Sequence, residues 1–418
     1  MKFLGIPIVA ISLGVSAAAK IAIPLHASSR WILDDNNERV KFRCLNWAGH
    51  MEVNLPEGLH RRSIGDLADF IKDQGFNCVR LTYSIDHALN PNVTVANTFT
   101  NAASAAGVPL ANMTAMYSAA VQKNPFMGHP NTTTSDVYGA VIDTLWDRGI
   151  MTLLDNHVSK ASWCCDLTDG NGWWDTAFGY LPFNSQYFHT REWLQGLEAM
   201  AAWAHASHPG VVAMSLRNEL RQVPPQDTNN GNDWYSLISE AGTLVHKTNP
   251  DVLVVVGGID AATDLSTVRL NRMLNTTGWP RKHVWEWHSY SFTITYPKFL
   301  PCATLTALYG AMAGFVLTQG KEYTAPLILS EFGVGQSGGS ISGGLNSDDS
   351  KYLSCLKGYM EGNDGDWALW AIQGSYYVRG GQTDYEETWG LLNHDWTALR
   401  NPQVSGLLGS MWNMTQGP

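Results

Sequence analysis

Two glutamates stand at places where a sequence rarely puts a charge. Glu219 ends the segment Ser-Leu-Arg-Asn-Glu and Glu331 ends Leu-Ile-Leu-Ser-Glu, each behind an apolar run. A surface carboxylate needs no explanation, but one at the end of a buried strand does. Two carboxylates that face each other across a cleft can hydrolyse a glycosidic bond. The plainer alternative is a structural ion pair, for example between Glu331 and Arg80.

Other apolar runs also end in polar or aromatic side chains. In chain order these are Arg80, Asn156, His157, Asn218, His288, Tyr290, Trp367 and Trp370. If the runs are parallel strands of one barrel, their carboxyl ends meet in a single mouth, where barrel enzymes place their catalytic groups.

Short apolar runs alternate with amphipathic stretches along the chain. The expected strands are 41–47, 76–84, 150–158, 211–220, 253–258, 283–291, 326–333 and 366–374. The expected helices are 59–75, 136–149, 192–205, 234–247, 306–318 and 350–362, with a weaker one over 261–274. Continuous apolar runs indicate parallel strands that are buried on both faces and joined by helices.

Eight such units in a chain of this length predict an α/β fold of the (β/α)8 type, the TIM barrel. A doubly wound open sheet is the rival fold, but it would need a Gly-rich phosphate turn after an early strand, and none is present. In an eight-stranded ring, strands four and seven lie on opposite sides. Glu219 and Glu331 should therefore point at each other across the mouth.

With these motifs in place, the sequence resembles the retaining β-glycosidases of glycoside hydrolase family 5, the cellulase family, over roughly residues 25–400. Asn218–Glu219 matches the Asn-Glu-Pro signature of that family, although Leu220 replaces the proline. Glu331–Gly333 matches the Glu-Phe-Gly of the nucleophile motif. Asn46-Trp47, Trp163-Cys164-Cys165 and the segment around Trp370 look most like a branch of the family found in fungi and plants.

The resemblance implies a role for each site residue. Glu331 would be the nucleophile, kept ionised by Arg80 and by a hydrogen bond from Tyr290, and both of these residues are also expected among those that bind the substrate. Glu219 would be the acid/base, with a raised pKa. Asn218 would bind the sugar 2-hydroxyl, His157 and His288 would shape the −1 subsite, and Trp370 would form its floor, whereas Trp367 is expected in the core. The two carboxyl groups are expected about 5–5.5 Å apart, which gives retention.

The composition of the chain limits the kinds of partner that it could bind. The chain has 418 residues and a net charge of −10, with no run of five Lys or Arg, so a nucleic-acid partner is not expected. The 17 Trp suit a protein that stacks on sugar rings. The histidines match no zinc spacing, and the two-carboxylate mechanism needs neither a metal nor a cofactor. We expect a carbohydrate partner, no membrane partner and a monomer.

Residues 1–19 have the pattern of a signal peptide: a lysine, an apolar run and small residues. We therefore expect a secreted protein with one catalytic domain, residues 20–418. Five Asn-x-Ser/Thr sequons, at Asn92, Asn112, Asn131, Asn275 and Asn413, are glycosylation candidates. No linker rich in Ser, Thr or Pro leads to a separate carbohydrate-binding module.

Six cysteines match no zinc pattern. Cys302 and Cys355 flank strand seven, and the resembled branch has Cys at both places, so we expect them to be bridged. Cys44 and Cys78 are expected free and buried. The adjacent Cys164 and Cys165 either bridge each other or pair elsewhere.

Three long segments follow strands two, three and eight and bear on the substrate. Residues 85–135 read as a long irregular insertion over the mouth, while 159–189 and 376–395 are rich in aromatics. Tall loops favour exo-action on β-glucan oligosaccharides or small β-glucosides, although the aromatics could instead pack the loops onto the barrel. The alternatives are a diglycosidase acting on a plant flavonoid glycoside, an endo-β-1,4-glucanase, a transglycosylase, and a catalytically inactive sugar-binding protein.

Overall fold

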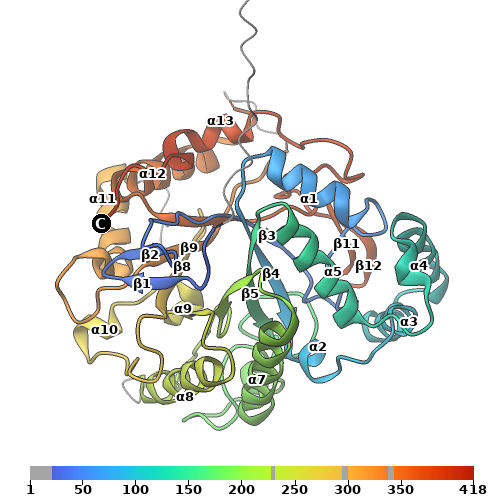
Figure 1. Cartoon of the computed structure of the whole chain (residues 1–418), viewed down its shortest axis with the longest axis horizontal. Helices are drawn as coiled ribbons and strands as arrows, with labels where there is room; N and C mark the ends of the chain where they lie inside the picture. The colour runs from blue at the N-terminus through green and yellow to red at the C-terminus, as the bar shows by residue number, and fades with distance from the viewer. Residues whose placement is uncertain (1–20, 227–230, 294–299, 338–342) are drawn as a thin grey trace, which may run out of the picture.

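Eight parallel strands close into a barrel in a computed structural model of the chain, which describes residues 21–226, 231–293, 300–337 and 343–418 (Figure 1). Around the ring the order is β10-β3-β4-β5-β6-β7-β8-β9. The strands are β3 (Arg43–Trp47), β4 (Cys78–Ser84), β5 (Met151–Val158), β6 (Val211–Ser215), β7 (Leu253–Gly257), β8 (His283–Ser289), β9 (Leu327–Phe332) and β10 (Asp366–Leu369). The predicted (β/α)8 fold is confirmed.

Helices surround the barrel and connect consecutive strands. They are α1 (Ile64–Asp73), α5 (Thr134–Asp147), α7 (Thr190–Ser207), α8 (Asn232–Thr248), α11 (Cys302–Met312) and α12 (Ser347–Asn363). The weaker helix predicted over 261–274 is replaced by two short pieces, α9 (Ile259–Ala262) and α10 (Thr267–Leu270). The last elements are α13 (Val404–Leu408) and the 3-10 turns η2 (Gly314–Leu317) and η3 (Gly409–Trp412).

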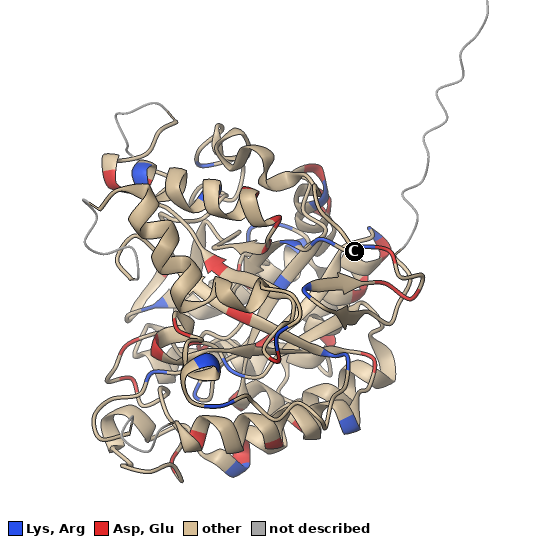
Figure 2. Ribbon diagram, turned by 90° about the vertical axis from the view of Figure 1, so that its left-hand side faces the viewer, with Lys and Arg blue, Asp and Glu red and all other residues tan. Residues whose placement is uncertain are grey.

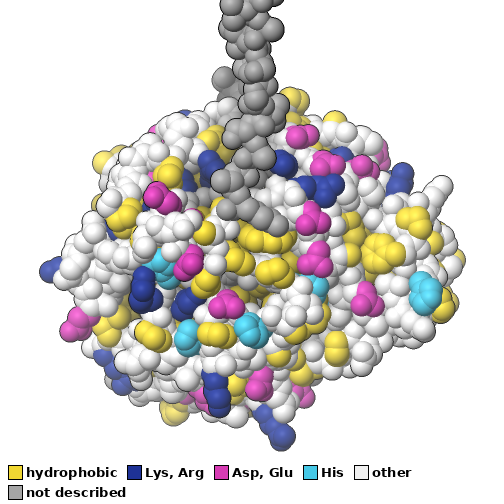
Figure 3. All heavy atoms as spheres, in the orientation of Figure 1, with side chains coloured by type: hydrophobic (Ala, Val, Ile, Leu, Met, Phe, Trp, Pro, Cys, Tyr) yellow, Lys and Arg dark blue, Asp and Glu magenta, His cyan; other side chains and the backbone are white. Residues whose placement is uncertain are grey.

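The amino-terminal end of the barrel is closed by a small hairpin of β1 (His26–Ser28) and β2 (Trp31–Leu33). Leu25 and Ile32 pack there against the first residues of the barrel strands, among them Cys44, Cys78 and Met151. On this face, hydrophobic side chains gather near the centre and charges of both signs surround them (Figure 3). The site must therefore open at the opposite end, where the strands finish.

The segment after β4 differs from the prediction. Residues 85–135 form helices instead of an irregular loop: α2 (Ile85–Leu89), α3 (Val95–Ala106), α4 (Leu110–Lys123) and the turn η1 (Pro125–Gly128). Val95, Phe99 and Ala102 give α3 one buried face, and the Thr94 hydroxyl caps its first turn. The segment packs beside β11 (Ser375–Arg379) and β12 (Gln382–Glu386), as Figure 1 shows, and contributes no described residue to the wall of the main cavity.

Three disulfides pair all six cysteines. Cys302 is bonded to Cys355 with a Cα–Cα distance of 5.0 Å, which confirms the predicted bridge. The expectation that Cys44 and Cys78 are free is wrong: they lie directly opposite each other on β3 and β4, with Cα atoms 4.2 Å apart, and are bonded. Cys164 and Cys165 are bonded to each other.

Charge is dispersed over the molecule. Figure 2 shows Lys and Arg scattered among Asp and Glu on the face it presents, without a basic patch. Among the described residues, no helix combines the length and the hydrophobicity that crossing a bilayer would require.

Candidate active site

Glu331, the fifth residue of β9, is held by two strong donors at the mouth of the barrel. Arg80 Nη1 donates to its Oε1 at 2.7 Å, and the Tyr290 hydroxyl donates to its Oε2 at 2.8 Å. His288 Nδ1 lies 3.7 Å from the same Oε2. These donors favour the ionised carboxylate, which is the form that a nucleophile requires.

Glu219 lies four residues beyond the end of β6, because that strand stops at Ser215 instead of continuing to residue 220 as predicted. Its backbone has φ of +36°, in the left-handed region that non-glycine residues avoid. Arg221 Nη1 donates to the Glu219 carbonyl at 2.8 Å, and Arg221 is itself held by Asp169 through two bonds of 2.9 and 3.0 Å. This turn directs the carboxyl group across the mouth toward Glu331.

The two carboxyl groups are close neighbours. One oxygen of Glu219, one oxygen of Glu331 and a ring nitrogen of His288 all lie within 4.8 Å of one another. That distance fits the separation of about 5–5.5 Å in retaining glycosidases better than the about 6.5–9.5 Å of inverting ones. His288 Nδ1 lies 2.9 Å from Glu219 Oε1 and so stands between the pair.

Arg80 lies beneath this pair, in the middle of β4 and fully buried. Besides Glu331 it donates to Asp155 at 2.8 Å, to Asn218 at 2.8 Å and to Asn46 at 3.0 Å. The predicted ion pair with Glu331 therefore exists as part of the site. Arg80, which is expected among the substrate-binding residues, does not line the cavity; it donates to Glu331 and Asn218, which do.

Burial and neighbouring charges act differently on the pKa values of the two glutamates. Burial raises the pKa of Glu219 to about 7, and Arg221 and Arg80 offset only part of that effect. Burial also raises the pKa of Glu331, while His288 and Arg80 oppose the increase. Since Glu331 has the stronger donors, it is the member of the pair that ionises first. For Arg80, burial disfavours the charge, but Asp155 and Glu331 outweigh burial and raise its pKa.

Behind the carboxylates, a series of side-chain hydrogen bonds links Asp155, His157 and Asn218. Asp155 Oδ2 lies 2.6 Å from His157 Nδ1, and His157 Nε2 lies 3.4 Å from Asn218 Nδ2. Burial lowers the pKa of His157 well below its ordinary value, so the ring is neutral and its Nε2 can accept a hydrogen bond. Burial likewise lowers the pKa of His288.

A cavity of about 820 Å³ opens above these groups. Six of the eight predicted site residues line it: His157, Asn218, Glu219, Tyr290, Glu331 and Trp370. Arg80 and His288 lie behind its wall. Trp370 follows β10 and its ring is nearly parallel to that of His157, with centroids 5.7 Å apart. Trp367 is fully buried in the core, as expected.

Several residues of the site were not predicted from the sequence. Asp155 stood inside a predicted strand, and a charge within an apolar run was the signal that could have found it. The pair Arg379 and Glu387, which also lines the cavity, gave no such signal because it comes from the segment after β10.

Two groups of possible metal donors occur in the described part of the chain. In one, His157, Cys164 and Cys165, the sulfurs are already bonded to each other. The other is the Glu219, His288 and Glu331 set, whose arrangement is that of a general acid and a nucleophile.

The chain is similar in sequence to a family model and to known proteins. Residues 33–375 match the family model described as Cellulase (glycosyl hydrolase family 5). A "Glycosyl hydrolase 5 family protein" of Chamaecyparis obtusa is 38% identical over 416 residues, covering 96% of this chain and 68% of that protein. An endoglucanase of Paenibacillus polymyxa is 24% identical over 404 residues, covering 92% of this chain and 86% of that protein.

Solved structures show the same fold at low identity. An endocellulase of Pyrococcus horikoshii has a TM-score of 0.69 at 18% identity, covering 94% of this chain and 99% of its own. The catalytic domain of the major endoglucanase of Xanthomonas campestris pv. campestris has a TM-score of 0.68 at 19% identity, covering 93% and 99%.

The raised pKa of Glu219 generates a testable pH dependence. With Glu219 as the expected acid/base and Glu331 as the expected nucleophile, the reactive enzyme has Glu219 protonated and Glu331 ionised, so kcat/KM should fall as the pH rises through about 7, where Glu219 loses its proton. Glu219→Gln cannot titrate, so on an aryl glycoside with an acidic phenol as leaving group its alkaline limb should disappear. A pH profile of kcat/KM for both proteins measures this. An unchanged limb in the variant would assign it to another group.

Proposed function

Because the chain belongs to glycoside hydrolase family 5, the cellulase family, and is a retaining glycoside hydrolase, we propose that it cleaves β-glucosidic bonds in β-glucan oligosaccharides or small β-glucosides. A carbohydrate substrate agrees with the Pyrococcus horikoshii endocellulase, three variants of which were solved with cellotetraose. The observation that carries the finer proposal is the contact between Arg379 and Trp163, which joins two loops at the wall of the cavity.

In the first step, an oxygen of Glu331 forms a bond to the anomeric carbon while the bond to the leaving oxygen breaks and Glu219 gives that oxygen its proton. The covalent intermediate removes the negative charge of Glu331, which lowers the pKa of Glu219. Glu219 can then take a proton from water, which attacks the same carbon and releases Glu331. Tyr290 and Arg80 hold Glu331 in place before and after the intermediate.

We infer that one end of the cavity is closed by the segments that follow β5 and β10, because these segments contact each other there. The guanidinium carbon of Arg379, at the end of β11, lies 3.3 Å from the ring centroid of Trp163. Arg379 Nη1 also pairs with Glu387 Oε2 at 3.3 Å, and that oxygen accepts the Tyr376 hydroxyl at 2.6 Å. The long segments after strands three and eight are thus fastened together beside Trp370.

This closed end is the glycone end. Trp370 and Glu331 lie on its side of the scissile bond, while Glu219 must stand beside the leaving oxygen. Trp163, Arg379 and Glu387 give it an aromatic face, a cation and an anion, which together suit the hydroxyls of a neutral sugar.

The opposite end of the cavity, beyond Glu219, is where the leaving group binds. Its wall includes Gln222, Asp260 and the exposed apolar side chain Leu167, on which an apolar aglycone can pack. The exposed Phe292 also lines the cavity, where its ring stacks on Tyr290.

The size of the cavity favours a diglycosidase as the second candidate. About 820 Å³ is near the upper end of the roughly 300–1,000 Å³ typical of small-molecule sites, which leaves space for a second glycone unit. Product analysis separates the candidates: β-glucosidase action releases glucose, diglycosidase action releases an intact disaccharide, and an endoglucanase cuts internally. Added acceptor alcohols would reveal transglycosylation.

If one end of the cavity is closed, we predict that the enzyme attacks oligosaccharides from their non-reducing end. On cello-oligosaccharides labelled at the reducing end, early samples should show the label on chains shortened by one or two units from the other terminus. Arg379→Ala should raise KM for short substrates about tenfold and allow internal cleavage. Arg400→Ala is the matched control, because Arg400 pairs with Glu386 of the same hairpin but does not line the cavity. Internal cleavage by the unaltered enzyme would contradict an exo-acting pocket.

We also propose that the protein is secreted. Residues 1–19, the expected signal peptide, lie outside the described residues, but all five sequon asparagines are exposed and all six cysteines are paired. Expressed with its leader in a eukaryotic host, the protein should accumulate in the medium, lose mass on enzymatic removal of N-glycans, and contain no thiol that alkylates without a reductant. Retention in the cell with free thiols would contradict the proposal.

A further inference from the structure

The Asn218 side-chain amide has only one possible orientation. Its Oδ1 accepts a hydrogen bond from Arg80 Nη2 at 2.8 Å, and a guanidinium can only donate, so the oxygen must face Arg80. The amide nitrogen therefore faces the other way. There it meets His157 Nε2 at 3.4 Å and the sulfurs of Cys164 and Cys165 at 3.6 and 3.5 Å.

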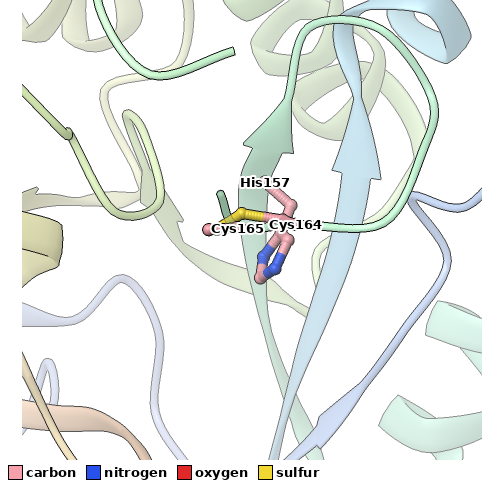
Figure 4. Close-up of side chains that lie close together, drawn as sticks. All are labelled: His157, Cys164 and Cys165. Carbon is pink, nitrogen blue, oxygen red and sulfur yellow. A yellow bond between two sulfur atoms is a disulfide. The ribbon is translucent and has the colours of Figure 1, made fainter. Parts of the chain in front are cut away.

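The Cys164–Cys165 disulfide lies against the catalytic groups and also lines the cavity. Figure 4 shows both sulfurs beside the His157 ring, on the segment that follows β5. Cys164 Sγ also accepts from Arg221 Nη1 at 3.5 Å, the same nitrogen that donates to the Glu219 carbonyl. The disulfide thus touches the side chain of Asn218 and the residue that fixes the backbone of Glu219.

Sulfur suits this position because it is a weak acceptor. A carboxylate or carbonyl oxygen here would bind the Asn218 N–H strongly and would compete with a substrate hydroxyl. The disulfide instead blocks rotation of the amide by its bulk and leaves the N–H that does not face His157 Nε2 available to the sugar. A pair of separate thiols could rotate away from Asn218, whereas the bonded pair cannot.

We propose that the Cys164–Cys165 disulfide is a positioning element that holds Asn218 for its hydrogen bond to the sugar 2-hydroxyl. The inference rests on the proposed glycosidase function and adds a specificity role for these two cysteines. The contact with the 2-hydroxyl strengthens in the transition state, so loss of the disulfide should lower kcat more than it raises KM.

The test compares an aryl β-glucoside with its 2-deoxy analogue. Cys164→Ala/Cys165→Ala should lose about tenfold to a hundredfold in kcat/KM on the glucoside, the usual effect of a misplaced group. On the 2-deoxy analogue, which lacks the hydroxyl, it should lose much less. In an Asn218→Ala background, removing the disulfide should add little further loss on the glucoside, because the two changes remove one interaction.

Cys302→Ala/Cys355→Ala is the matched control, since it removes a disulfide outside the cavity wall and should leave the 2-hydroxyl preference intact. If the Cys164/Cys165 variant does not fold, the comparison is made on native enzyme reduced with a water-soluble phosphine and alkylated. Equal losses on both substrates, or additive losses in the Asn218→Ala background, would overturn the proposal. An unaltered enzyme that cleaves no glycoside would instead contradict the proposed function.

Discussion

A single buried guanidinium organises the carboxyl end of this barrel. Arg80 is fully buried, and its four hydrogen-bond acceptors come from β3, β5, β9 and the segment after β6: Asn46, Asp155, Glu331 and Asn218. A charge in such a place is stable only when it is paired and hydrogen-bonded. Removing Arg80 would leave Asp155 and Glu331 uncompensated, at a typical cost of about 3–5 kcal/mol. The register of the strands and the chemistry of the site therefore depend on the same contacts.

The different roles that we propose for the two glutamates follow from their different distances to Arg80. Glu331 contacts Arg80 and Tyr290 directly, whereas Glu219 meets His288 and is reached by Arg80 only at a distance. Burial acts on both, but only Glu331 has strong donors against it. One carboxyl group is thus ready to attack while the other still carries the proton that the leaving oxygen needs.

Much of this site could be read from the sequence because parallel strands end at one edge. Glu219, Glu331 and Tyr290 follow apolar runs, and the closed ring brings those ends together. The same reasoning placed Arg80 at the end of its strand, although both the predicted strand, 76–84, and β4 continue to Ser84, so Arg80 lies inside the strand. The sequence does not predict the bond between Cys44 and Cys78, because the register that sets them opposite each other is fixed only by the closed barrel.

Contacts between distant loops were beyond sequence reasoning. The Arg379 stack on Trp163 joins segments more than 200 residues apart, and nothing local in either segment indicates the other. The helices within 85–135 were not predicted for a different reason. Their apolar spacing at Val95, Phe99 and Ala102 was visible, but the richness in Ala, Asn and Thr concealed it.

The roles of Glu331 and Glu219 are the central claim, and the stereochemistry of azide products tests them most directly. Glu219→Ala, given an aryl β-glucoside with an acidic phenol, should still form the intermediate, and added azide should release the β-glycosyl azide, because a small anion needs no general base. Glu331→Ala cannot form the intermediate and, if azide restores any turnover, should give the α-azide. The opposite pairing of anomers with variants would show that the nucleophile and the acid/base are exchanged.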